Sequence, residues 1–398
     1  MKAPKILIAG LLALFTAAVA PAQETIHITG STAYRSAVHQ AILDMLGGTV
    51  SYGYSGTAGV GKASQAIFTG TVSNINVTIK TSWSGSLAGL ETVAQAIPGA
   101  TVNTFLVNST PMSSGGTQSA PAVYDAPTIP EVGMEDGEQL TTIFPTPAVV
   151  QNKVGVVAFK WLCNQGAAVG LTNITANQIR ELYSLGHIPL SMFTGNSNAV
   201  TTNVYALGRD WDSGTRNCAF LEAGVQTYTS ALTATAVKQY QPLDGSGNVV
   251  GSSYANPIAS QQLWPCDTVD FLTFCNGDGG YNSGGDLGTA MKESSPFIYV
   301  AYLGLSDATT AENSGAGATD LTYNGVAFSA NNLENGPYSF WCYEYLNYLP
   351  TYATTDANGY EVANILAAQI SNESLLSVGA NLNLMNVTRS QEGGPIAP

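Results

Sequence analysis

Histidines and basic residues are scarce in this chain, and only one long hydrophobic run occurs. The 398 residues include three histidines and 13 lysines and arginines against 27 acidic residues, which gives a formal net charge of −14. A surface this acidic repels polyanions, and this argues against nucleic acid or an anionic membrane as a partner. No CxxC pair occurs, and three histidines cannot supply a zinc-binding pattern. We therefore expect no metal and no other cofactor.

Two patterns of enzymes and nucleotide-binding proteins are also missing. Residues 56–64 nearly match a P-loop, but Ala63 stands where a Ser or Thr would hold magnesium. This segment is interpreted as a Gly-rich turn before a helix. The G-x-S-x-G elbow of serine hydrolases is absent, and no histidine lies near the Ser-rich turns in sequence. The chain is therefore not expected to be an enzyme, and a secreted hydrolase is kept as a minor alternative.

The long hydrophobic run lies at the amino terminus. Lys2 and Lys5 precede the apolar residues 6–20, and Ala20-Pro21-Ala22 fits the small-x-small cleavage rule of signal peptides. The run is short for a membrane span. We expect residues 1–22 to be a cleaved signal peptide and the mature protein to lie in the periplasm or outside the cell. Removal of the two lysines lowers the basic residues from 13 to 11 and the net charge from −14 to −16.

Five cysteines in an oxidising compartment allow at most two disulfides. Cys266 and Cys275 are the first expected pair, because they are close in sequence. The pairing of the others is left open.

A strand, a polar turn and a helix follow one another three times, with Ser or Thr in each turn. The three units cover residues 26–46, 77–94 and 204–224. Their polar residues are Ser31 and Thr32 in the first unit, Ser84 and Ser86 in the second, and Arg209, Ser213, Gly214 and Thr215 in the third.

Such a turn points free backbone N–H groups and the positive end of a helix dipole at one place. Arg209 adds a planar, permanently charged fork that suits oxyanions. A single turn of this kind is explained more simply by a Ser that caps a helix. Three of them indicate a shared anion site, since helix N-termini that follow parallel strands meet along one edge of a sheet.

The rest of the chain is typical of an α/β layered fold. Buried strands are expected at residues 153–160 and 297–303, and a capping box formed by Thr175 and Gln178 begins a helix that runs to about Ser184. The aromatic-rich residues 338–349 are interpreted as a helix. Residues 226–262 are rich in Thr, Ser and Gly and are not assigned. Strands that alternate with helices favour mixed sheets with flanking helices.

Six segments, taken in order, resemble the phosphate-binding periplasmic proteins of ABC importers, which have the type II periplasmic-binding fold. They are residues 28–32 (ITGST), 82–89 (SWSGSLAG), 131–136 (EVGMED), 179–188 (IRELYSLGHI), 209–215 (RDWDSGT) and 279–285 (GGYNSGG). The 209–215 segment is the most specific of these. The resemblance extends thinly over most of the mature chain.

The resemblance implies two α/β domains that close on a ligand in the cleft between them by hinge bending. With crossovers near 150–159 and 296–303, the first domain would comprise residues 23–155 plus 300–398, and the second residues 156–299. The ligand residues it implies are Ser31, Thr32, Ser84 or Ser86, Asp136, Arg209, Ser213, Gly214 and Thr215. The implied partners are phosphate or a similar oxyanion and the membrane subunits of an ABC importer, with the protein itself a monomer.

One departure from the family pattern affects selectivity. Where the family has Asp and then Gly between the Arg and the Ser, this chain has Trp211 and then Asp212. A bulky aromatic side chain is therefore expected in the loop, which leaves the preferred oxyanion open. The alternative function is that of an extracellular adhesive or carbohydrate-binding protein on the same fold, without a transport role.

Overall fold

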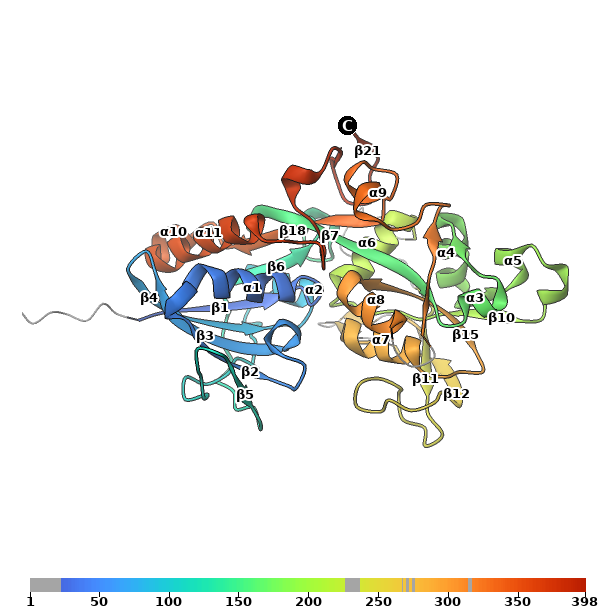
Figure 1. The fold of residues 1–398 in the computed structure, drawn as a ribbon, viewed down its shortest axis with the longest axis horizontal. Helices are drawn as coiled ribbons and strands as arrows, with labels where there is room; N and C mark the ends of the chain where they lie inside the picture. The colour runs from blue at the N-terminus through green and yellow to red at the C-terminus, as the bar shows by residue number, and fades with distance from the viewer. Residues whose placement is uncertain (1–22, 226–236, 267, 270–271, 274–275, 314–316) are drawn as a thin grey trace, which may run out of the picture.

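The computed structural model describes residues 23–398 apart from 226–236, 267, 270–271, 274–275 and 314–316. The expected signal peptide and Cys275 lie outside the described residues. Within the described ranges, no helix has both the length and the apolar character to cross a membrane. The fold is mixed α/β, and Figure 1 shows two lobes joined along one side by long strands.

A 13-stranded mixed sheet extends through both lobes in the order β5-β2-β3-β4-β1-β6-β18-β7-β15-β10-β9, with β16 and β19 also paired to β7. Its strands are β5 (Thr117–Ser119), β2 (Ser51–Ser55), β3 (Gln65–Val72), β4 (Ile75–Ser82), β1 (Glu24–Gly30), β6 (Val132–Asp136), β18 (Trp341–Tyr348), β7 (Val150–Cys163), β15 (Ile298–Gly304), β10 (Asn203–Ala206), β9 (His187–Pro189), β16 (Thr319–Asp320) and β19 (Gly379–Ala380). Short pairs outside this sheet are β11 (Tyr240–Leu243) with β12 (Ser260–Leu263), β13 (Thr268–Val269) with β14 (Leu272–Thr273), β17 (Thr322–Tyr323) with β8 (Asn173–Ile174), and β20 (Thr388–Arg389) with β21 (Ile396–Ala397).

β7 connects the lobes because its two halves pair with different strands. Residues 150–158 pair with β18, whereas residues 159–163 pair with β15. Its continuous apolar run from Val154 to Phe159 is buried, as expected for a strand covered on both faces. β18 in turn pairs with β6 of the first lobe. The domain boundaries given above stay a prediction, although β18 rather than β15 is the strand that pairs with both β6 and β7.

The predicted helix at residues 338–349 is wrong, because this segment contains strand β18. Trp341, Tyr343 and Tyr345 alternate along the strand, although Trp341, Tyr345 and Tyr348 are also at helical spacing, and all eight residues of the strand are buried. Aromatic side chains fit a strand that is covered on both faces, and the sequence alone did not distinguish this from a helix.

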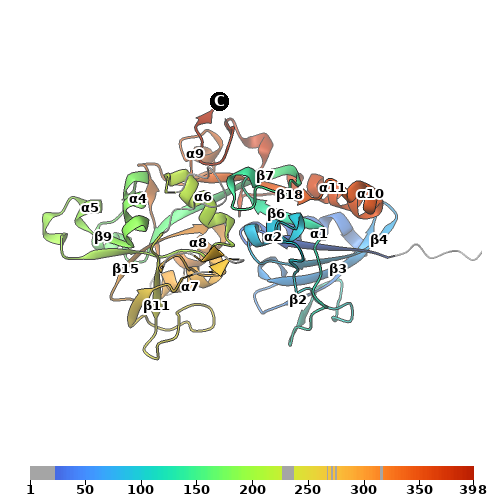
Figure 2. The same cartoon turned by 180° about the vertical axis from the view of Figure 1, so that it is seen from behind.

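Helices cover the sheet in both lobes (Figures 1 and 2). They are α1 (Arg35–Leu46), α2 (Ser86–Ala94), α3 (Gly166–Val169), α4 (Ala176–Leu185), α5 (Ser191–Thr194), α6 (Gly214–Ala223), α7 (Gly284–Lys292), α8 (Leu305–Glu312), α9 (Ala330–Glu334), α10 (Tyr352–Thr355) and α11 (Ala357–Asn372), with short 3-10 turns η1 (Gly47–Thr49), η2 (Val60–Lys62), η3 (Gln139–Thr141), η4 (Ser197–Ala199) and η5 (Leu382–Leu384). The helices of the three predicted units are α1, α2 and α6. The Thr175–Gln178 capping box of α4 is confirmed. The Gly-rich residues 56–62 lead into η2 and strand β3 rather than into a helix, because residues 65–72 pair with β4.

A disulfide joins Cys218 of α6 to Cys342 of β18. Cys266 is a free, exposed cysteine, so the expected Cys266–Cys275 pair is not formed, and Cys163 is free and buried. The sequence separation of 124 residues between Cys218 and Cys342 explains why proximity along the chain did not reveal the pair.

Candidate functional site

The first polar turn meets the end of β6 at Asp136. β1 runs parallel to β6, so that Gly30 lies opposite Met134, and the Ser31 backbone N–H donates to the Met134 carbonyl at 2.8 Å. The Ser31 hydroxyl donates to Asp136 Oδ1 and accepts from the Tyr34 backbone N–H at 3.1 Å. Asp136 is almost completely buried, with 1% of its surface exposed. The carboxylate therefore lies under the turn that precedes α1.

The second turn reaches the same place through Ser86 rather than Ser84. The Ser86 hydroxyl, at the start of α2, accepts from the Asp136 backbone N–H at 3.1 Å. Ser84 is exposed, and its hydroxyl lies 3.2 Å from Thr29 Oγ1. Of the two alternatives that the sequence left open, only Ser86 contacts Asp136.

The third turn places the N-terminus of α6 on Ser86 and Asp136. Ser213 caps the helix by accepting from the Arg216 backbone N–H at 3.2 Å, and Thr215 Oγ1 donates to Asp136 Oδ2 at 3.3 Å. A Cβ on Gly214 would lie 2.5 Å from Ser86 Oγ and 2.8 Å from Asp136 Cβ, so only glycine fits here. Figure 2 shows α2, α6 and β6 together where the lobes meet.

Backbone donors surround this junction. Within the described residues, the N–H groups of Thr32, Ala33, Gly214 and Thr215 make no hydrogen bond with the protein. The latter two belong to the first turn of α6, whose N–H groups lack intrahelical acceptors and form the positive end of the helix dipole. Thr32 is 9% exposed at the same junction. The arrangement can donate several hydrogen bonds to one anion.

Arg209 is held at the site by the backbone of residues 281–282. Its Nε donates to the Tyr281 carbonyl at 2.9 Å, and its Nη2 donates to the Asn282 carbonyl at 3.0 Å. Nη1 makes no hydrogen bond within the described part of the chain, and only 2% of the residue is exposed. The positive charge of Arg209 acts to lower the pKa of Asp136. One nitrogen of the guanidinium is thus left for a ligand.

The bulky side chain expected to intrude at this loop is directed away from Asp136. Trp211 is 2% exposed and packs with Leu87 and Leu90 of α2. The Arg216 guanidinium lies 4.3 Å from the centre of the Trp211 ring, and its Nη1 donates to the Arg209 carbonyl at 2.9 Å. Trp211 and Arg216 therefore support the loop that carries Arg209.

Three supporting residues escaped the sequence analysis. The Tyr302 hydroxyl accepts from the Arg209 backbone N–H at 3.0 Å, and Gln239 Nε2 donates to the Arg209 carbonyl at the same distance. Glu344 lies opposite Asp136 on the neighbouring strand. These residues are far from the loop in sequence, and no local pattern marks them.

Burial controls the titration of Asp136. Burial raises its pKa, and the Ser31 hydrogen bond, Glu344 and Arg209 act to lower it. Glu344 and Glu135 are also completely buried, and burial together with the charge of Asp136 raises the pKa of each. Burial thus shifts the pKa of all three carboxyl groups upward, and Asp136 has the largest set of opposing contacts.

His39 supports the second turn. Its Nδ1 donates to the Val60 carbonyl at 2.6 Å, while Nε2 accepts from Trp83 Nε1 at 3.0 Å. Burial lowers its pKa to about 3, so the ring is neutral around pH 7. Both ring nitrogens are engaged, and neither is available as a base for a serine. Among the residues that the structure describes, no group of three His, Cys, Asp or Glu side chains could hold a metal ion.

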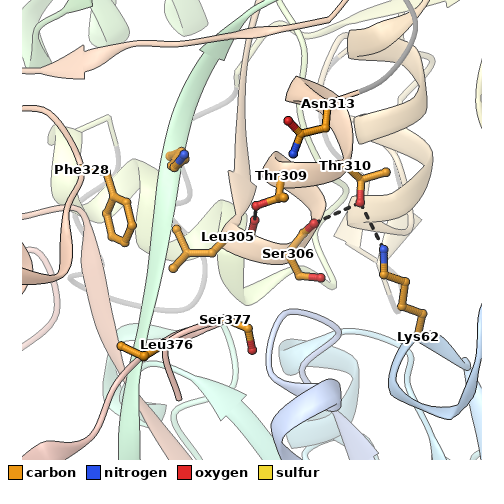
Figure 3. Close-up of a pocket in the computed structure, with 10 residues that line it drawn as sticks. Lys62, Leu305, Ser306, Thr309, Thr310, Asn313, Phe328, Leu376 and Ser377 are labelled. Atoms are coloured by element: carbon orange, nitrogen blue, oxygen red, sulfur yellow. Dashed lines mark hydrogen bonds between the residues drawn. The ribbon is translucent and has the colours of Figure 1, made fainter. Parts of the chain in front are cut away.

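A separate cavity of about 520 Å³ lies between η2 and α8 (Figure 3). Lys62 Nζ donates to Thr310 Oγ1 across it at 3.2 Å. The second lysine, Lys160, pairs with Glu312 at 2.9 Å and with Asp320 at 3.0 Å. The charge of Lys160 is therefore balanced by carboxylates of the protein itself.

No family model matches this chain, and no curated protein is significantly similar to it in sequence. Among solved structures it is similar to an ABC-type phosphate transport receptor from Vibrio cholerae, with 12% identity, a TM-score of 0.45 and coverage of 86% of this chain and 93% of that chain. A protein from Clostridium perfringens, assigned as a phosphate ABC transporter substrate-binding protein and solved with bound phosphate, has 12% identity and a TM-score of 0.45 and covers 88% and 94%. PstS from Borrelia burgdorferi has 11% identity and a TM-score of 0.38 and covers 87% and 97%. The site of this chain is therefore interpreted from its own residues.

Proposed function

We propose that this chain is an exported solute-binding protein that captures phosphate or a related oxyanion between its two lobes and delivers it to an ABC importer. The observation that carries the proposal is the meeting of three polar turns at Asp136. Ser31, Ser86 and Thr215 come from three separate units, and each makes a hydrogen bond with this residue.

The chemistry of the junction suits a tetrahedral oxyanion. The free N–H groups of the first and third turns, the Thr32 hydroxyl and Arg209 Nη1 are donors, and each hydrogen bond to a charged group contributes about 1.5–3 kcal/mol. Several such bonds together supply the roughly 8 kcal/mol of a micromolar complex after the entropy of association is subtracted.

Asp136 would select for an anion that carries a proton. A carboxylate only accepts hydrogen bonds, and hydrogen phosphate can donate one to it. Sulfate has no proton near pH 7, so two anionic oxygens would face each other in a dry site. The site therefore favours phosphate over sulfate.

Entry of the anion requires the junction to open. Thr215 and Gly214 of α6 contact Asp136 and Ser86 directly. The proposed domains, residues 23–155 plus 300–398 and residues 156–299, would separate by bending at the crossovers near residues 150–159 and 296–303. A monomer is sufficient for this motion.

Titration calorimetry of ligand-free mature protein with phosphate and with sulfate tests the proposal. Wild-type protein should bind phosphate with micromolar or tighter affinity and sulfate much more weakly. Arg209→Ala should abolish phosphate binding, and Asp136→Asn should reduce the discrimination against sulfate. Lys238→Ala is a control that removes an exposed positive charge. Absence of heat with either anion would contradict the proposal and favour the glycan-binding alternative, whereas turnover of phosphoesters would favour the hydrolase.

A further inference from the structure

Glu344 and Asp136 place two carboxyl groups side by side in the core. The residues are cross-strand neighbours on β18 and β6, and they are 0% and 1% exposed. On the other side of β18, Glu344 pairs with Gly155 of β7, and a Cβ on Gly155 would lie 2.0 Å from the Tyr34 hydroxyl. Tyr34, Glu344 and Asp136 therefore share one face of the sheet directly below the anion site.

Two ionised carboxylates with no hydrogen-bond donor between them are unstable in a site without water. Within the described residues, neither oxygen of Glu344 receives a hydrogen bond, and the Tyr34 hydroxyl has no partner either. Glu344 lies within hydrogen-bonding reach of the Asp136 carboxylate. Two ionised carboxylates in contact repel each other strongly, whereas one proton turns one of them into a donor to the other.

The surroundings decide which group holds the proton. Asp136 accepts from Ser31 and Thr215 and lies near the charge of Arg209, all of which stabilise its ionised form.

Glu344 has no such donors. The titratable groups that act on it from β6 are Asp136 and Glu135, and Glu135 Oε2 accepts from Asn347 Nδ2 at 3.1 Å. Tyr34, in the turn before α1, faces Glu344, and the residue of β7 that pairs with Glu344 is Gly155, which has no side chain. None of these groups is positively charged, so the proton belongs on Glu344.

We propose that Glu344 is a specificity-determining residue of the anion site, which holds one proton and donates it in a hydrogen bond to Asp136, so that the pair carries a single negative charge when an anion binds. This inference rests on the proposed function. Loss of the Glu344 proton at high pH would place a second negative charge behind the site and weaken anion binding. Gain of a second proton at low pH would make Asp136 a donor and admit sulfate.

The test compares the phosphate affinity of wild-type protein, Glu344→Gln and Glu392→Gln from about pH 5 to about pH 10. Glutamine keeps a donor to Asp136 but does not titrate. On the alkaline side, the loss of phosphate affinity in wild type should therefore exceed the loss in Glu344→Gln by on the order of tenfold. The titration of phosphate itself is common to both proteins and cancels in the ratio. Glu392→Gln is the control: Glu392 is also buried, and it accepts a hydrogen bond from the Tyr343 backbone N–H. The pH profile of this variant should follow that of wild type.

Infrared spectroscopy of the two proteins provides a second measurement that does not depend on phosphate binding. The absorption of buried protonated carboxyl groups near neutral pH should be weaker in Glu344→Gln than in wild type by the contribution of one carboxyl group, while buried Glu135 and Glu392, whose pKa values are also raised, still contribute in both proteins. Superimposed affinity profiles for wild type and Glu344→Gln, or a protonated carboxyl band of equal intensity in both proteins, would overturn the role of Glu344 while phosphate binding itself stands. A wild-type protein that binds no phosphate at any pH would instead overturn the proposed function and, with it, this role.

Discussion

Gly214 lies so close to Ser86 that a Cβ on the glycine would be 2.5 Å from the serine hydroxyl oxygen. Gly214 is the first residue of α6 and Ser86 the first residue of α2, so two helix N-termini meet over Asp136. The dipoles of two helices thus act at one point, as the proposed anion site requires.

The Gly214→Ala variant tests whether this close approach is needed. The added methyl group must push α6 away from Ser86 and Asp136, which costs about 1–3 kcal/mol of packing and separates the donors of the site. We expect phosphate affinity to fall by roughly tenfold or more in calorimetry. Gly48→Ala is the matched control, because a Cβ at Gly48 meets no atom within 4 Å. Equal affinity of the two variants would show that the contact of Gly214 plays no part in binding.

The Cys218–Cys342 disulfide should stabilise the region around the site. It ties α6 to β18 across 124 residues of sequence. Replacing both cysteines with alanine should lower the free energy of unfolding by about 2–5 kcal/mol in urea denaturation. A reducing agent should destabilise wild-type protein but not the double variant. Cys163→Ala, at a buried free cysteine, controls for the loss of a sulfur atom. Reductant-insensitive stability of the wild type would contradict the prediction.

Local patterns in the sequence predicted the polar turns well. Ser31, Ser213 and Thr215 stand at the start of amphipathic or capped segments, where spacing and capping chemistry act over a few residues. The mixed α/β fold follows from the same alternation of strands and helices.

Long-range contacts were not predictable in the same way. The segment of β18 was predicted to be a helix. The strands that bury its aromatic residues, β6 and β7, are distant in sequence, so local spacing could not reveal them. Glu344, Tyr302 and Gln239 were missed for the same reason, and the direction of Trp211 depends on the apolar face of α2. Such features arise only when the sheet assembles.

Glu392 should make the protein less stable as the pH rises through neutrality. Burial raises its pKa to about 7 from an ordinary 4.5. A group whose pKa is raised in the folded state binds more protons there, so the stabilisation is fully present below pH 4.5 and lost as the pH approaches 7. The difference corresponds to roughly 3 kcal/mol. Urea denaturation at several pH values should show this slope in wild type relative to Glu392→Gln, and parallel curves would refute it.

His39 should have the opposite effect. Burial lowers its pKa to about 3 from 6.5, so the unfolded chain binds more protons between these values and stability falls on acidification. From pH 7 to pH 4 the loss is roughly 3 kcal/mol. The same protonation would break the bond that Nε2 accepts from Trp83 and would disturb the turn that carries Ser86.

The His39→Phe variant isolates this contribution because phenylalanine does not titrate. It should be less stable than wild type at pH 7, since the Val60 carbonyl and the Trp83 N–H lose their partner. The deficit should narrow by roughly 3 kcal/mol at pH 4, because only the wild type must then protonate a buried ring. Glu392 and His39 thus act in opposite directions below neutrality. On acidification, the free energy of unfolding relative to wild type should rise in His39→Phe and fall in Glu392→Gln. A change of the same sign in both variants would contradict both assignments.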